Sequence, residues 1–218
     1  MFESRFFGSD IAVKEFAEKY SKEINSVWVK NYEPKEKYTD SYERYKYIFE
    51  TSCRYGMGNG EKKIQEEYLN AYMSVNKIFI EAYKKEGIDI ATVTVQNEPK
   101  AVQRWDSCIY TAEEERDFVK NHLGKKMQDI GVKILFWDHN KERILDRAKV
   151  MLSDEKAKEY VNGMAFHWYS GDHFEQLEMF HKLYPDKEIM FSEGCYEYSR
   201  GAEDTVKIGE RYAYDMIG

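Results

Sequence analysis

Four short apolar runs in the second half of the sequence each end in, or are closely followed by, side chains that can take part in chemistry. These side chains are Glu98, then Asp138, then His167, Trp168 and Tyr169 together, and finally Glu193. The runs span residues 88–95, 132–137, 164–168 and 189–191. Successive groups lie about 25 to 40 residues apart, which is the length of one strand plus one helix in an α/β protein.

This spacing would bring the groups together if the runs were parallel strands of a barrel. In a (β/α)8 barrel the carboxyl ends of the strands meet on one rim, which holds the active site. Glu98 and Glu193 would then face each other across a pocket lined by aromatic rings. Glycoside hydrolysis needs such a pair, because one acid protonates the leaving oxygen while the other attacks the anomeric carbon or activates water. Either glutamate alone would more often be a solvated loop residue, so the pairing carries the catalytic interpretation.

The neighbouring rings and the thiol have structural alternatives. His167 can equally be a hydrogen-bonded packing residue, and Trp137 and Trp168 can be core side chains, as aromatic residues beside strands often are. Cys195, two residues after Glu193, is interpreted as a packed thiol, because no histidine is placed in the sequence to activate it.

The sequence also contains residues of metal-ligating type and a cluster of acidic residues. Asp138, His139, His167 and His173 include metal-ligating types, but no spacing such as His-x-x-x-His supports a site, and we predict no metal and no other cofactor. The three glutamates at 113–115 are interpreted as a first helical turn that interacts favourably with the helix dipole.

The elements that position these residues follow from the hydrophobic pattern. The four runs are apolar on consecutive residues, as in strands of a parallel sheet buried on both faces. Helical spacing is found at 10–29, 64–86 and 144–152, a capping box starts a helix at Thr111, and further helices are predicted after 172 and over 204–217. No Gly-x-Gly-x-x-Gly follows a strand, so a barrel is favoured over a dinucleotide-binding sheet. The fold class is therefore α/β.

Composition limits the class of protein. The chain has 218 residues, of which 16% are aromatic, and a formal net charge of −7. This charge argues against a nucleic-acid surface, and no apolar window is long enough for a membrane span. Three widely spaced cysteines do not form a disulfide framework. No signal peptide is recognised, which gives a cytoplasmic location by default and leaves localisation otherwise open.

Several motifs resemble those of a known family. Residues 94–99, 166–169 and 191–195 are similar to signatures of glycoside hydrolase family 30, in particular its glucosylceramidase-like β-glucosidases. The stretches 105–116, 137–140 and 167–174 are similar to the bacterial branch. The resemblance is nearly continuous from about residue 61 to 218 and implies a TIM barrel. Members of this family are often secreted or lysosomal.

The resemblance implies a retaining two-carboxylate mechanism on β-glucosides or related β-glycosides. Glu98 takes the place of the acid/base at the end of strand four, and Glu193 that of the nucleophile at the end of strand seven. Substrate contacts are implied for six further residues: Asn97 at the sugar 2-hydroxyl, Tyr169 beside the nucleophile, Trp105 at the pocket mouth, and Asp138, His167 and Trp168 on the rim. The partner implied is a carbohydrate substrate.

The resemblance also predicts how the chain is organised. Residues 61–218 are expected to form a partial TIM barrel, roughly strands four to seven with their helices, truncated at both ends relative to the family. Residues 1–60 are expected to be a divergent, helical N-terminal segment. An alternative to an active enzyme is an inactive remnant that at most binds carbohydrate or protein. Open barrel edges further predict self-association.

Overall fold

The structure is a computed structural model that describes residues 10–31, 40–45, 66–101, 109–195 and 205–217. Trp105, predicted at the pocket mouth, lies outside these residues. Within the described ranges, no helix has both the length and the apolar character needed to cross a membrane.

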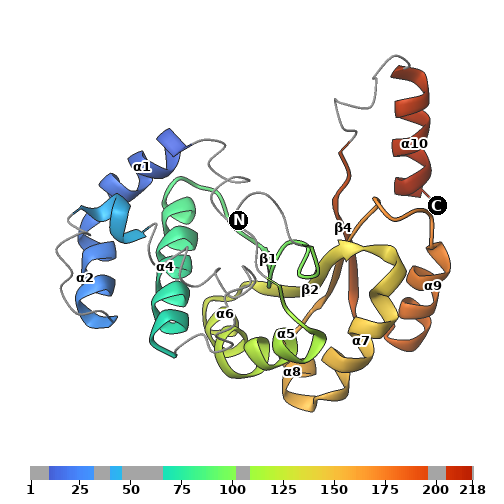
Figure 1. Ribbon diagram of the computed structural model, residues 1–218, viewed down its shortest axis with the longest axis horizontal. Coiled ribbons are helices and arrows are strands. Elements are labelled where there is room, and N and C mark those ends of the chain that lie inside the picture. The colour runs from blue at the N-terminus through green and yellow to red at the C-terminus, as the bar shows by residue number, and fades with distance from the viewer. Residues whose placement is uncertain (1–9, 32–39, 46–65, 102–108, 196–204, 218) are drawn as a thin grey trace.

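A four-stranded parallel sheet forms the centre of the fold (Figure 1). The strands are adjacent in chain order: β1 (Thr92–Thr94), β2 (Lys133–Asn140), β3 (Gly163–His167) and β4 (Glu188–Glu193). Helices connect each strand to the next, so the sheet curls as a half-barrel. The predicted partial TIM barrel is thereby confirmed.

The strand bounds differ from the predicted runs at both ends of the sheet. The predicted strand at 88–95 is paired only over β1, because its register with β2 begins at Thr92 opposite Lys133. Ile88 is 52% exposed. In contrast, β2 continues past the apolar run to Asn140, and this extension carries Asp138 and His139.

The helix that follows β1 begins at the predicted capping box. The Thr111 hydroxyl accepts a hydrogen bond from the Glu114 amide, and the Glu114 carboxylate accepts one from the Thr111 amide. The helical stretch continues through α5 (Ala112–Phe118), the π-helical turn η3 (Val119–Leu123) and α6 (Gly124–Ile130). It ends at Gly131, whose φ of 73° is a left-handed conformation that glycine adopts at low cost.

Further helical elements follow β2, β3 and β4 towards the C-terminus. They are a 3-10 turn η4 (Lys141–Arg143), α7 (Ile144–Ser153), α8 (Glu155–Tyr160), α9 (Phe174–Leu183) and α10 (Thr205–Ile217). The sequence did not predict α8, which is short and is capped by the Asp154 carboxylate. In Figure 1, α10 stands beside the end of β4, away from the other helices.

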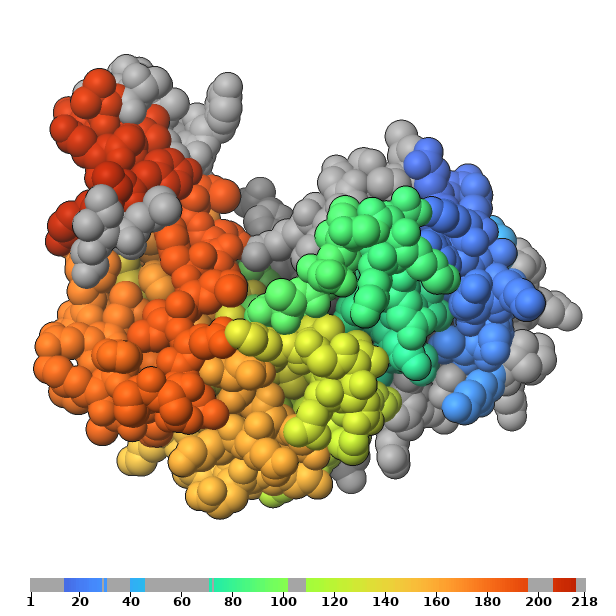
Figure 2. Space-filling model, turned by 180° about the vertical axis from the view of Figure 1, so that it is seen from behind, coloured from blue at the N-terminus to red at the C-terminus, as the bar shows by residue number. Residues whose placement is uncertain are grey.

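The N-terminal described residues are helical, as predicted. The expected helix over 10–29 is two helices, α1 (Asp10–Lys19) and α2 (Ser21–Asn31), separated at Tyr20, and α4 (Glu66–Lys85) packs against α2. Phe16 of α1 lies 5.9 Å from Phe79 of α4 between ring centroids. Figure 2 shows these helices (blue to green) on the side of the molecule opposite β4 and α9 (orange). The division at residue 60/61 stays a prediction.

The two inner strands are buried and the last strand is not. Every residue of β3 is buried, whereas Ile189 and Met190 of β4 are 37% and 40% exposed. Successive strand residues point to opposite faces, so both faces of β4 are partly exposed at its amino-terminal half.

Gly163 starts β3 at a point where the backbones of β3 and β4 approach closely. A Cβ atom at this position would lie 2.0 Å from the carbonyl oxygen of Glu188. We expect Gly163→Ala to lower the free energy of unfolding by about 1–3 kcal/mol, because the strand pairing would have to shift. Urea unfolding measures the change.

Gly209 in α10 provides the matched control, since a Cβ atom there meets nothing within 4 Å. Gly209→Ala is expected to leave stability unchanged or raise it by about 0.5–1 kcal/mol. Equal unfolding midpoints for the two alanine variants would contradict the close approach of β3 and β4.

Candidate active site

A bulge in β2 shapes the rim of the sheet. The register between β2 and β3 shifts between Trp137 and His139, so Asp138 is an extra residue in β2. Trp137 and Asp138 have φ values of 75° and 48°, which are unusual for residues other than glycine. The bulge turns the Asp138 carboxylate towards the neighbouring strands.

The Asp138 carboxylate contacts side chains of three neighbouring strands. It accepts hydrogen bonds from Thr94 of β1 (2.7 Å) and Ser192 of β4 (2.6 Å), and it lies 3.1 Å from Nε2 of His167 in β3. Burial alone would raise the pKa of Asp138, but the hydrogen bonds with His167, Ser192 and Thr94 lower it below its ordinary value. Asp138 is therefore a buried anion at the centre of the rim.

The His167 ring lies between three carboxylates. Its Nδ1 is 3.2 Å from Oε1 of Glu98, while its Nε2 contacts Asp138 and lies 3.9 Å from Oε2 of Glu193. Burial disfavours the charged ring, yet the hydrogen bonds with Asp138 and Glu98 outweigh burial and raise the pKa of His167 above 6.5. The two glutamates predicted from the sequence thus reach the same imidazole ring.

The backbone around Glu98 is also held by the bulge. The Glu98 amide donates to the carbonyl of Asp138 at 2.9 Å, and Glu98 has a positive φ of 47°. His139 stacks on Trp137 with 4.9 Å between ring centroids, and its Nδ1 is 4.0 Å from Oε1 of Glu98. Burial lowers the pKa of His139, so its neutral form is favoured.

Tyr169 contacts the second glutamate. Its hydroxyl donates to Oε1 of Glu193 at 3.1 Å and accepts a hydrogen bond from the Cys195 amide at 2.9 Å. Burial is the main cause that raises the pKa of Tyr169 to about 12, so the hydroxyl keeps its proton at neutral pH. Cys195 itself is exposed, and the expectation of a packed thiol is wrong.

Two other predicted substrate-binding residues are Trp168, which packs among aromatic rings, and Asn97, which has a buried amide oxygen. Trp168 is 6% exposed and packs against Phe191 and Tyr212, with ring centroids 5.9 and 4.6 Å away. The Asn97 Oδ1 is buried and has no hydrogen-bond partner among the described residues. The substrate contacts predicted for both residues stay predictions.

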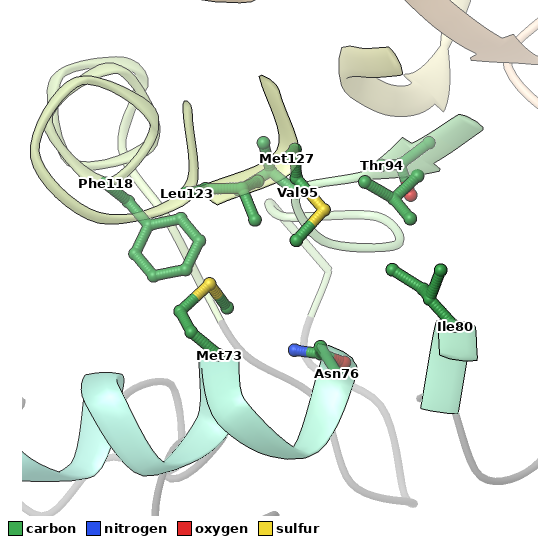
Figure 3. Close-up of a pocket in the computed structure, with 9 residues that line it drawn as sticks. Met73, Asn76, Ile80, Thr94, Val95, Phe118, Leu123 and Met127 are labelled. Carbon is green, nitrogen blue, oxygen red and sulfur yellow. The ribbon is translucent and has the colours of Figure 1, made fainter. Parts of the chain in front are cut away.

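Two further features of the described residues have the character of ligand sites. A small cavity between α4 and β1 is lined mainly by apolar side chains, and the rim carboxylates do not belong to its described lining (Figure 3). Glu98, His139 and His167 each place one potential ligand atom within 4.8 Å of the others, as a cation site requires. These atoms already have partners within the protein. His139 Nδ1 accepts a hydrogen bond from the Asn140 amide, and His167 Nδ1 contacts the Glu98 carboxylate. The prediction of no metal stays a prediction.

The rim was compared with known proteins. The family described as "Glycosyl hydrolase family 30 TIM-barrel domain" matches residues 17–216. The chain belongs to this family.

Relatives within family 30 include enzymes of different substrate classes. Lysosomal acid glucosylceramidase of Mus musculus is 34% identical over 153 residues, which are 64% of this chain and 30% of that protein. The crystal structure of SrfJ from Salmonella typhimurium is 35% identical with a TM-score of 0.65, covering 71% of this chain and 35% of that chain. The endo-β1,6-glucanase BT3312 is 35% identical with a TM-score of 0.57, covering 64% and 32%. The chain spans about 30% of the length of the curated relatives it matches.

Sequence reasoning missed several residues of this family 30 rim. Thr94 and Ser192 lie inside the quoted motifs but were given no role, although each bonds Asp138. The sequence places Glu115 in a first helical turn and gives it no further role, whereas in the structure it is 1% exposed. Its spacing of three and four residues from Phe118 and Val119 places it on their buried helix face, a signal that the sequence already contained.

The contacts of His167 predict how stability depends on pH. The folded-state pKa of His167 is raised, so its protonation stabilises the fold fully below the unfolded pKa of about 6.5. This contribution is lost as the pH rises through the folded pKa. We expect the difference in unfolding free energy between wild type and His167→Gln to shrink across that range in urea titrations.

The matching measurement is NMR titration of the imidazole ring, whose midpoint is expected above 6.5. A midpoint below this value, or a stability difference that grows with pH, would contradict the ion pair between His167 and Asp138.

Proposed function

We propose that this chain carries the catalytic rim of a retaining β-glycoside hydrolase, with Glu193 as nucleophile and Glu98 as acid/base. The observation that supports this most directly is the contact of both carboxylates with the single ring of His167. Glu193 is the last residue of β4, and Glu98 lies in the loop after β1. The two carboxylates therefore come from two strands of the same rim that are not adjacent. The proposal is supported by the glycosidase relatives of the chain.

Glu193 is suited to nucleophilic attack by its surroundings. Tyr169 donates to one carboxylate oxygen, which orients the group and favours its ionised form. Attack on the anomeric carbon forms the bond between Glu193 and the sugar, while the bond to the leaving oxygen breaks. The raised pKa of Tyr169 keeps this donor protonated through the reaction.

Glu98 must change its protonation state between the two steps, and His167 fits both states. A neutral His167 that keeps its proton on Nε2 for Asp138 accepts from a protonated Glu98 at Nδ1. A charged His167 donates from Nδ1 to an ionised Glu98 instead. The two arrangements hold the same number of protons and differ only in whether the shared proton lies on Glu98 or on Nδ1 of His167. Glu98 gives this proton to the leaving oxygen in the first step and, as an ionised base, takes one from the attacking water in the second.

A β-glucoside is the proposed substrate, and a β-1,6-linked glucan is the second candidate. The first follows the glucosylceramidase relative and the second the endo-β1,6-glucanase structure. Asn97 supports sugar binding, because its buried amide oxygen has no partner among the described residues and can accept from a hydroxyl group. Trp168 would serve this site mainly by packing behind Tyr169.

The nucleophile is tested by covalent trapping. A 2-fluoro glucoside with a good leaving group is expected to add one sugar mass to Glu193, detected by mass spectrometry of peptides. Wild type is expected to release nitrophenol from nitrophenyl β-glucoside, and Glu193→Gln to reduce the rate to background. Glu98→Gln is expected to lower kcat by about 10²–10⁴-fold on substrates that need acid assistance.

Asp172 provides a matched control, since its side chain is half exposed and pairs with Arg211 rather than with either glutamate. Asp172→Asn is expected to keep wild-type activity. Equal, near-blank rates for wild type and Glu193→Gln on both the glucoside and β-1,6-glucan would reject the enzymatic proposal. They would favour the alternative of an inactive carbohydrate- or protein-binding remnant.

Self-association through the open sheet edge is part of the same proposal. It is supported by the exposure of Ile189 and Met190 on β4 and of Met179 and Leu183 on α9. Sedimentation velocity is expected to show association that rises with concentration, and Met190→Lys is expected to weaken it several-fold.

Val206→Lys on α10 is the control, because Val206 is exposed but lies on a different element. A wild-type chain that stays monomeric at all accessible concentrations would show that this edge does not self-associate.

A further inference from the structure

A buried carboxylate that belongs to none of the predicted site residues lies behind the bulge of β2. Oε1 of Glu115, on α5, accepts a hydrogen bond from the amide of Trp137 at 2.8 Å. This amide belongs to the residue at which β2 leaves regular pairing with β3. An amide displaced from a strand ladder in the core needs another acceptor, and Glu115 supplies it.

Arg147 of α7 holds this carboxylate in place. Its guanidinium lies 3.3 Å from Oε2 of Glu115, donates to the carbonyl of Tyr110 at 2.9 Å, and stacks 4.7 Å from the Trp137 ring centre. Burial is the largest influence on Glu115 and raises its pKa, while the Trp137 amide and Arg147 oppose this rise. The carboxylate has protein partners on both of its oxygens.

The bulge connects Glu115 to the reacting groups through two short steps. Asp138 follows Trp137 directly, and its carboxylate contacts Nε2 of His167. The Asp138 carbonyl accepts from the Glu98 amide at 2.9 Å, which fixes the backbone of the acid/base. A movement of Trp137 would therefore displace both the backbone of Glu98 and the ring that contacts its carboxylate.

We propose that Glu115 is a positioning residue, whose hydrogen bond to the Trp137 amide holds the left-handed bulge at Trp137 and Asp138 and thereby sets the geometry of Glu98 and His167. This inference rests on the proposed glycosidase function. Glu115 does not touch the reacting atoms and acts through the backbone. Without the acceptor, Trp137 and Asp138 lose a bond that compensates their positive φ values of 75° and 48°.

The test distinguishes loss of the hydrogen-bond acceptor for the Trp137 amide from loss of the buried ion pair. It uses two double variants of Glu115 and Arg147. Both carry Arg147→Met, so neither leaves an unpaired guanidinium in the core. Glu115→Gln with Arg147→Met keeps an amide oxygen for Trp137, whereas Glu115→Leu with Arg147→Met has no acceptor. Both have the same net charge.

The activity readout is the division of the effect between kcat and KM. We expect kcat of the leucine double variant to lie about 10–100-fold below that of the glutamine double variant, because small misplacements of a catalytic group cost that much. KM is expected to change by a smaller factor than kcat, since neither variant removes a side chain of the predicted substrate-binding set.

Hydrogen exchange provides a readout that does not depend on activity. The Glu98 amide is expected to lose protection in the leucine double variant and to keep it in the glutamine double variant, while the Ala165 amide in β3 stays protected in both. Wild type without glycosidase activity would reject the proposed function, but the exchange of the Glu98 amide would still decide the role of Glu115.

Equal kcat and equal Glu98 protection in the two double variants would overturn the proposal. If the leucine double variant does not fold, Glu115→Asp replaces it, because the shorter side chain keeps the charge for Arg147 and withdraws the oxygen from Trp137. Wild-type kcat and wild-type Glu98 protection in Glu115→Asp would also overturn the proposal.

Discussion

The rim depends on the ionised carboxylate of Asp138. Its partners come from β1, β3 and β4, so one side chain of β2 connects all four strands at their carboxyl ends. Burying a charge is costly unless hydrogen bonds and an opposite charge compensate it, and here two hydroxyl groups and His167 do so. No single βα unit can assemble this arrangement, because each partner of Asp138 lies on a different strand. The site therefore forms only when the sheet has formed.

The same arrangement explains how a rim with few strands can hold two glutamates near each other. Glu98 is fixed through its backbone by the Asp138 carbonyl and through its carboxylate by His167. Glu193 is the last residue of β4, in register with His167, and Tyr169 orients it from the loop that follows β3. The positions of Glu98 and Glu193 are thus set by neighbours within the described residues.

Much of this architecture was predictable, because it rests on local patterns. The capping box at Thr111, the αL glycine at Gly131 and the apolar strands all have sequence signatures, and the strand ends place Glu98 and Glu193 on one rim. The bulge in β2 was not predictable, since neither Trp137 nor Asp138 is a glycine and tertiary bonds alone stabilise their left-handed backbone. The six-residue helix α8 buries only Ala157 and shows no helical period. The exposure of Cys195 depends on the end of β4, which no local pattern describes.

The π-helical turn η3 has a consequence for how the sequence of this helix can change. A π turn closes its hydrogen bond over one residue more than an α turn, so it delays the rotation of the helix by part of a turn. Buried side chains therefore recur at every fourth position from Glu115 through Val119 and Leu123 to Met127, where an uninterrupted α-helix would carry them steadily around its surface. Removing one residue from this turn would close it as an ordinary α turn, because five residues in π conformation advance the helix by about the same angle as four in α conformation. Glu115 would then still face β2. A single deletion within this turn can therefore be tolerated, whereas a deletion within α5 or α6 would rotate Glu115 by about 100° relative to Met127.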